Sequence, residues 1–329
     1  MGWAHGQPGR TAAAAFLALI ASGFLLSGCD TTSYRQPVAS FASGAGAAQA
    51  ALVEIDKQAA AKVAAIYRDR AVKGQAFLDH KADECTVGAT RCRLTVTIQS
   101  QEREVPPDSP LRNTIAVMGQ VAVYAQGLNA IVTADTAEQA KSDVNATLGS
   151  AQDLARLVAE LGGGDLTSAT VPEFATPVGE AVNWLLGAYV EHVKLEGLRR
   201  ATSDANPIIQ EAAEVAGAEA AIAGDIQRRS LSELVSARLD AFDESRTEAN
   251  YDALLAAAAA YDAFLTSAPD DVFQQMAQAH DALTRSLQDR SLSLADVAAR
   301  ISTFERQAQD LWRIAQALAQ IGAGQEGVE

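Results

Sequence analysis

The sequence predicts an all-α protein, an elongated helical bundle of antiparallel, coiled-coil-like hairpins with one small β element. Alanine dominates the 329 residues and aromatic residues make up only 5% of them. Alanine favours helix but buries little area, so the core should be long and thin. Apolar residues recur at three- and four-residue spacing along most of the chain. Residues 93–99, RLTVTIQ, give the only clear two-residue alternation, which is typical of a strand.

Residues 12–26 form an apolar or small-residue run behind the single basic residue Arg10. A bilayer-spanning helix needs about 20 apolar residues, so this run is short for a span. Its length and flanks are typical of the apolar region of a secretory signal. An ordinary signal peptide would carry an Ala-x-Ala pattern at the cleavage point, and the end of this run has none. An uncleaved anchor remains the other alternative.

The run ends in Leu26-Ser27-Gly28-Cys29, which resembles the lipobox of bacterial lipoprotein precursors. The resemblance implies that residues 1–28 are removed and that Cys29 receives a diacylglyceryl group, usually followed by a third acyl chain. Two or three acyl chains hold a protein on a membrane without a transmembrane helix. The implied location is the bacterial envelope, with the mature domain in the periplasm. Asp30 resembles the signal that keeps enteric lipoproteins in the inner membrane.

Four segments follow from this reading. Residues 1–28 are the signal peptide, and residues 29–48 are expected to be a flexible tether because Thr, Ser, Gly, Pro and Ala show little periodicity there. Residues 49–322 form the helical domain. Residues 323–329 are expected to be a disordered tail.

Helix signals divide the domain. A helical stripe (Leu52, Ile55, Ala59, Val63, Ile66) predicts a first helix to about His80. A second helix is expected over 111–132, and a third over 136–161 with Thr136 as its cap and Gly162 after its end. A helix around Trp184 follows. Asn206-Pro207 then predicts a new start, and the pattern continues to about Ser267, with a capping-box break near Ser230.

Two stripes of 3-4 spacing lie near the C-terminus. The first is Tyr251, Leu254, Ala258, Tyr261 and Leu265, and the second is Val297, Ile301, Phe304, Ala308, Leu311, Ala315 and Leu318. Pro269 lies between them and predicts a turn. We therefore expect the two stripes to pair as an antiparallel helical hairpin.

Two cysteines remain after Cys29. Cys85 and Cys92 bracket a Gly-centred loop directly before the alternating residues. In an oxidising compartment such a pair predicts a disulfide that pins a β-hairpin or single strand at about 85–100. A zinc site would need two more ligands, and only His80 is near in sequence. The spacing is also wrong for a Cys-x-x-Cys redox pair.

The charge balance restricts the partners. The chain has 41 acidic and 26 basic residues, and loss of residues 1–28 removes one arginine and no acid, which changes the net charge from −15 to −16. Bulk charge therefore argues against nucleic acid and anionic headgroups as ligands. The sequence has no nucleophile-elbow, Walker, zincin or dinucleotide motif, so we predict neither enzymatic activity nor a cofactor or metal.

Histidines and acids supply the remaining candidates. His192 beside Glu196 and His280 beside Asp281 could form metal pairs, but a polar surface explains both more simply. An acidic cluster is a candidate partner surface: Asp240, Asp243, Glu244 and Glu248. We predict a non-enzymatic scaffold that binds an envelope protein through helical surfaces. The alternative is a lipid or small-ligand carrier with a pocket between helices around Trp184.

Overall fold

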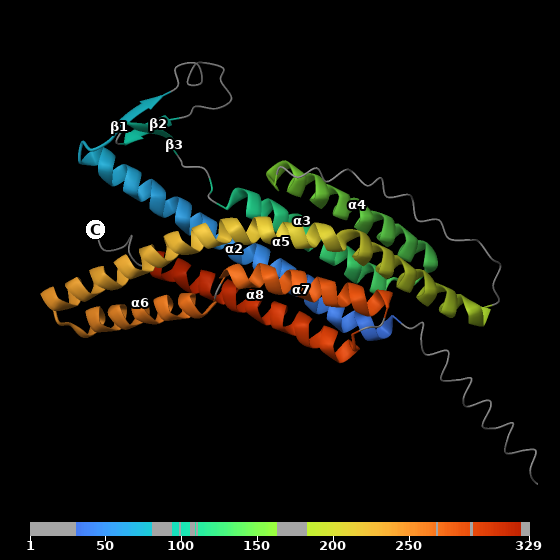
Figure 1. The fold of residues 1–329 in the computed structure, drawn as a ribbon. Coiled ribbons are helices and arrows are strands. Elements are labelled where there is room, and N and C mark those ends of the chain that lie inside the picture. Colours follow the sequence, from blue (N-terminus) through green and yellow to red (C-terminus); the bar gives the residue numbers. More distant parts are fainter. Residues whose placement is uncertain are drawn as a thin grey trace, which may run out of the picture.

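A computed structural model describes residues 31–80, 94–98, 100–105, 109, 111–162, 183–267, 269–289 and 292–323. These residues form long helices and one small sheet. In chain order the elements are α2 (Thr32–Val72), β1 (Phe77–His80), β2 (Leu94–Ile98), β3 (Gln101–Val105), α3 (Arg112–Thr133), α4 (Ala137–Gly162), α5 (Asn183–Glu244), α6 (Glu248–Ser267), α7 (Pro269–Gln288) and α8 (Leu294–Ala323). The helices lie side by side in an elongated bundle (Figure 1), which confirms the predicted mainly helical fold.

The longest hairpin joins α5 to α6 and α7. Hydrogen bonds link Asn250 to Ala241, Gln210 to Ala277 and Arg199 to Leu287, so α6 and α7 together run antiparallel to α5. The chain reverses between α5 and α6, and α7 continues in the direction of α6 (Figure 1). The predicted turn at Pro269 is therefore wrong. Proline is tolerated in the first turn of a helix, and here it begins α7.

The C-terminal stripe is buried as predicted, but its main partner differs from the expected one. All seven residues from Val297 to Leu318 at this spacing are at most 6% exposed. They face α2, where Phe41 contacts the Phe304 ring at a centroid distance of 5.6 Å and Gln58 donates to the Ala315 carbonyl. Residue numbers rise together in these contacts, so α2 and α8 run parallel.

The stripe predicted on α6 is wrong in register. Tyr251 and Leu265 are each 48% exposed, whereas Ala257, Ala260 and Phe264 are buried. An alanine-rich helix carries several apolar stripes of similar strength, and tertiary packing selects one of them. Phe264 packs with Leu231, Ala260 and Leu318 in a small cluster.

The tether predicted over 29–48 is contradicted from residue 32 onward. α2 begins at Thr32 and buries Val38, Phe41, Ala45 and Ala48 completely. Small residues let α2 approach α8 closely: a Cβ on Gly44 would lie 2.7 Å from the Phe304 ring. The small residues that resembled a linker therefore form a close helix-packing surface.

Two predicted breaks in α5 are also absent. Pro207 lies inside the helix, although an interior proline removes one backbone hydrogen bond and costs about 3 kcal/mol. Packing of α5 against α7 offsets that cost. Ser230 is buried, and its carbonyl accepts a hydrogen bond from Lys62 of α2 at 3.3 Å. By contrast, the predicted cap of α4 is confirmed, since the Gln139 amide donates to the Thr136 hydroxyl at 3.1 Å.

The β element is a three-stranded antiparallel sheet in the order β1-β2-β3. α2 ends at Val72, earlier than predicted, because Gly74 has φ +68° and the Gln75 amide bonds back to the Arg70 carbonyl at 2.8 Å. β2, which contains the alternating residues Leu94 to Ile98, is the central strand and is paired on both sides. Cys85 and Cys92 lie outside the described residues.

The two longest helices, α2 and α5, both extend beyond the core, so the last part of each helix has no buried residues. No described residue of α2 beyond Ala59 is buried, and none is buried between Leu231 of α5 and Ala257 of α6. The end of α2 with the sheet forms one prong, and the α5–α6 turn forms another (Figure 1). Both prongs lie at the end of the bundle opposite Thr31.

Candidate functional site

The predicted acidic cluster lies at the α5–α6 turn. Asp240, Asp243 and Glu244 belong to the last turns of α5, Glu248 is the first residue of α6, and all four are exposed. The structure therefore brings these residues to the outermost point of one prong. We call residues 232–256 the tip.

Asn250 fixes the backbone of the tip. Its side-chain amide donates to the Ala241 carbonyl at 3.1 Å and to the Ser245 carbonyl at 2.7 Å, which satisfies carbonyls at the end of α5. Its backbone amide donates to the Thr247 hydroxyl at 3.2 Å, which caps α6. The turn is therefore held by specific hydrogen bonds, although few side chains cover it.

The acidic residues at the end of α5 are unfavourably placed for helix stability. The C-terminus of a helix carries partial negative charge, and acids there cost a few tenths of a kcal/mol each. α5 has no basic residue in its last turn. Local helix stability therefore does not explain Asp243 and Glu244.

The opposite end of the bundle holds the start of α2. Both the amide and the hydroxyl of Thr31 donate to one carboxylate oxygen of Glu191 on α5, with an amide distance of 2.9 Å. Lys194, whose side chain is only 3% exposed, pairs with the other Glu191 oxygen at 3.0 Å. We call Thr31, Glu191 and Lys194 the mount.

Electrostatics favour a charged Glu191. Burial raises the pKa of this carboxyl, but the hydrogen bonds from Thr31 and the contact with Lys194 outweigh burial and lower the pKa overall. Glu191 is therefore ionised at neutral pH and holds both partners. No sequence pattern could predict this contact, because 160 residues separate Thr31 from Glu191.

A buried polar chain crosses the centre of the bundle. His280 is fully buried, with Nδ1 3.0 Å from Asn206 Oδ1 and Nε2 2.9 Å from the Tyr124 hydroxyl. The Asn206 amide nitrogen lies 3.4 Å from Asp281. The prediction of a surface position for His280 is therefore wrong, whereas His192 is exposed as predicted.

Burial keeps His280 neutral. It lowers the pKa of His280 to about 3, and the nearby Asp281 charge offsets it only in part. Burial, with a smaller contribution from Asp204, also raises the pKa of Tyr124, which therefore stays protonated. The neutral ring carries one proton. With that proton on Nδ1, His280 donates to Asn206 Oδ1, and Nε2 accepts from the Tyr124 hydroxyl, which also lies 3.2 Å from the Ala201 carbonyl. This chain ties α3, α5 and α7 together and reaches no open cleft.

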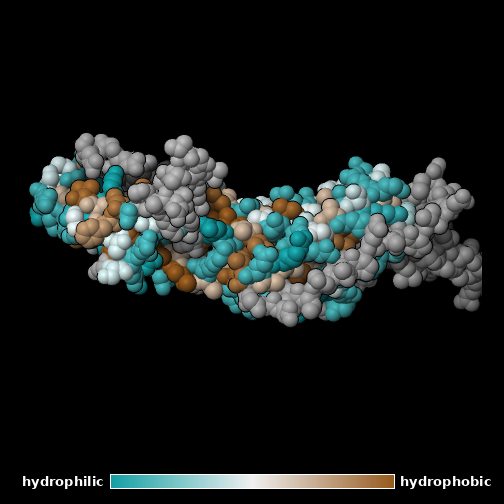
Figure 2. Space-filling model, turned by 90° about the horizontal axis from the view of Figure 1, so that it is seen from above, coloured by the Kyte–Doolittle hydropathy of each residue, from teal (hydrophilic) through white to brown (hydrophobic). Residues whose placement is uncertain are grey.

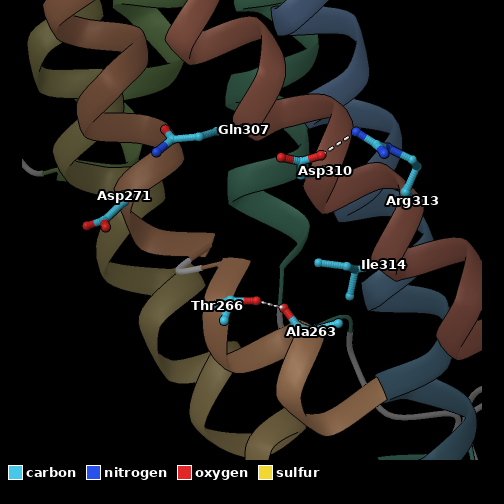
Figure 3. Close-up of a pocket in the computed structure, with 7 residues that line it drawn as sticks. All are labelled: Ala263, Thr266, Asp271, Gln307, Asp310, Arg313 and Ile314. Atoms are coloured by element: carbon cyan, nitrogen blue, oxygen red, sulfur yellow. Dashed lines mark hydrogen bonds and ion pairs between the residues drawn. The ribbon is translucent and has the colours of Figure 1, made fainter. Parts of the chain in front are cut away.

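The hollows in the described structure do not suit an apolar ligand. A shallow cleft of about 300 Å³ between α6, α7 and α8 has a mixed polar lining, with Arg313 paired to Asp310 (Figure 3). An apolar cavity beside Leu52 and Phe264 has only about 10 Å³, about the space of one water. The side chain of Trp184, where the carrier alternative placed a pocket, lies outside the described residues.

Within the same described ranges, no group of three or more His, Cys, Asp or Glu side chains could hold a metal ion. Two helices, α2 and α3, are long and apolar enough to cross a membrane, with 44% and 50% of their most apolar windows buried inside the bundle. Core helices of a soluble bundle have the same composition, so this feature is weak support for spanning.

Comparison with known proteins gives no family. No family model, curated protein or solved structure matches the chain.

Proposed function

We propose that this protein is a non-enzymatic, lipid-anchored scaffold of the bacterial envelope that presents its tip to a partner protein. The lipobox-like residues LSGC support the anchor at Cys29, and the long bundle with small cavities supports a scaffold over a carrier. The mature domain would then face the periplasm.

The mount carries this proposal. Two residues can span at most about 7 Å, so lipid on Cys29 lies within that reach of Thr31. Because Glu191, which is itself paired with Lys194, holds Thr31, the bundle would connect to the membrane without a long flexible tether. The anchored end and the tip are at opposite ends of the bundle (Figure 1).

The distance between mount and tip follows from helix geometry. From Glu191 to Glu244, α5 advances about 80 Å at 1.5 Å per residue. A bundle that stands on its anchored end therefore presents Asp243 and Glu244 far from the headgroups. An acidic surface there favours a protein partner with basic and apolar groups.

Site-specific photo-cross-linking in intact cells tests this function. A photoreactive residue at Glu248 is expected to give one defined adduct, and the same residue at exposed Arg306 on the side of the bundle serves as the matched control. The Glu248 adduct should disappear when Cys29→Ala prevents acylation. Equal adducts from both positions, or a Glu248 adduct that persists without acylation, would contradict the proposal.

The disulfide also belongs to this proposal. Strands β1 and β2 pair with His80 opposite Leu94, which brings together the two ends of the segment containing Cys85 and Cys92. An oxidising periplasm would favour their pairing. Non-reducing peptide mapping of native protein should link the two peptides, and titration of two free thiols would contradict the pairing.

A further inference from the structure

We infer that the tip binds the basic end of α2 and the start of β1 in a second copy of the chain. This inference rests on the proposed role of the tip as the partner surface. It names the partner as an identical molecule, so that two copies associate through their prongs.

The second surface is the corner between α2 and β1, which we define as Arg68, Val72, Lys73, Phe77 and Leu78. Val72 is 82% exposed, Phe77 78% and Leu78 60%, which places them among the most exposed large apolar side chains of the described chain. Hydrophobic residues are visible at this end of the molecule in Figure 2. Three large exposed apolar side chains within seven consecutive residues favour an interaction surface here.

The tip carries a matching apolar face. The rings of Phe242 and Tyr251 are in contact at a centroid distance of 5.8 Å across the hairpin. Leu239 lies three residues before Phe242, and Leu255 lies four residues after Tyr251, so helical periodicity places all four on one side of the hairpin. Leu239, Tyr251 and Leu255 are each about half exposed, at 47%, 48% and 51%.

The charges of the two surfaces are complementary. Residues 60–80 contain four basic and two acidic side chains, a net charge of +2 in a strongly acidic chain. The tip, residues 232–256, contains six acidic and two basic side chains, a net charge of −4. Opposite charge around apolar centres gives both attraction and orientation.

The positions of the two surfaces suit a two-fold dimer. Corner and tip lie at the same end of the bundle and are separated from each other within one molecule (Figure 1). In a two-fold arrangement the corner of each copy meets the tip of the other, so both contacts form twice and the assembly closes. If the two-fold axis runs parallel to the long axis of both bundles, the anchored ends of the two copies point toward the same membrane.

A charge-swap experiment on full-length acylated protein in detergent tests the inference. Variant A carries Arg68→Glu and Lys73→Glu, which change the net charge of residues 60–80 from +2 to −2. Variant B carries Asp240→Lys, Asp243→Lys and Glu244→Lys, which change the net charge of the tip from −4 to +2. In each variant alone, corner and tip have the same sign, so we expect the dimer dissociation constant to rise about tenfold or more. Mixing A with B restores opposite charges at both contacts, so a heterodimer of near wild-type affinity should form.

Mass photometry gives the stoichiometry, and circular dichroism confirms that each variant is folded. Arg306→Glu, an exposed reversal on the side of α8, is the control and should leave dimerisation unchanged. A wild-type protein that stays monomeric at all concentrations would overturn the inference, as would folded A and B that fail to combine. If the wild type is monomeric but variant B still abolishes the Glu248 cross-link in cells, the tip binds a different protein, and only the proposed scaffold role stands.

Discussion

Thr31 and Glu191 are joined by two hydrogen bonds although they lie 160 residues apart. The contact fixes the first turn of α2 to α5. If the protein is the scaffold proposed above, the orientation of its bundle on the anchor would depend on this one carboxylate.

Removing that charge should loosen the start of α2. Glu191→Gln keeps the size of the side chain but weakens the charge-assisted bonds from Thr31 and leaves Lys194 buried without its carboxylate. Amide exchange in residues 32–40 should accelerate, while exchange in α8 stays unchanged. Glu196→Gln is the control, because Glu196 pairs with partly exposed Arg199 and does not reach α2.

The mount should also weaken in acid. The folded pKa of Glu191 lies below its ordinary value of 4.5, so its stabilising effect is present above that pH and is lost as pH falls through the folded pKa. Protection of residues 32–40 against amide exchange, relative to the exchange rate of an unstructured chain at the same pH, should therefore fall as the pH drops below 4.5 in the wild type. In the Glu191→Gln variant, amide exchange at residues 32–40 should lack this additional acid sensitivity.

His280 predicts a second pH dependence with a different window. Its folded pKa is about 3 and its ordinary value is 6.5, so the unfolded chain binds the proton first as pH falls. The free energy of unfolding should decrease from about pH 6.5 downward, by about 5 kcal/mol at pH 3. Urea unfolding at several pH values measures this slope.

Two histidine variants separate the effect of His280 on the pH dependence of the unfolding free energy from the effects of other groups. His192→Gln should leave it unchanged, because His192 is exposed. His280→Gln should lower stability at pH 7 but flatten the decline between pH 6.5 and 4. An unchanged decline in His280→Gln would assign the acid sensitivity to other groups.

Close packing between α2 and α8 predicts opposite effects at two neighbouring glycines. A methyl group on Gly44 would press on the Phe304 ring and on the Glu305 backbone, so Gly44→Ala should destabilise the protein by about 1–3 kcal/mol. Nothing lies within 4 Å of a Cβ on Gly46, so Gly46→Ala should stabilise the helix by about 0.5–1 kcal/mol. Thermal unfolding of both variants checks the sign of each change.

Tip and core should respond differently to new charge. Leu311→Asp places an unpaired carboxylate in a fully buried position and should cost several kcal/mol, enough to unfold the C-terminal half. Asp243→Lys and Glu244→Lys lie on exposed positions at a helix C-terminus and should leave stability within about 0.5 kcal/mol. Loss of folding in the tip variant would show that the acids stabilise the fold.

The sequence predicted helices more successfully than their partners. The stripe from Val297 to Leu318 could be read correctly because large apolar residues recur strictly there. The helix that covers this stripe could not be predicted, since periodicity identifies a buried face but not the helix that packs on it. α2 packs on the stripe through small residues such as Gly44 and Ala45, and small residues of this kind are also typical of a flexible tether.

The candidate sites also divide into residues that could be found from sequence and contacts that only the fold reveals. Acidic residues at 240–248 could be found from sequence because they are close together in the chain. His280 could have been placed in the core, because Phe273, Met276, Leu283 and Leu287 put it on the apolar face of α7. Its partners Tyr124 and Asn206 come from other helices, so only the fold reveals the network.

The most direct test of the scaffold is the height of the tip above the membrane. Fluorescent residues are placed at His192 near the mount or at Glu248 on the tip of the acylated full-length protein in vesicles that contain headgroup-quencher lipids. We predict strong quenching at His192 and none at Glu248. A long Gly/Ser linker inserted between Asp30 and Thr31 should reduce that difference. Equal quenching at the two positions without the linker would mean that the bundle lies flat on the membrane, and would contradict the account.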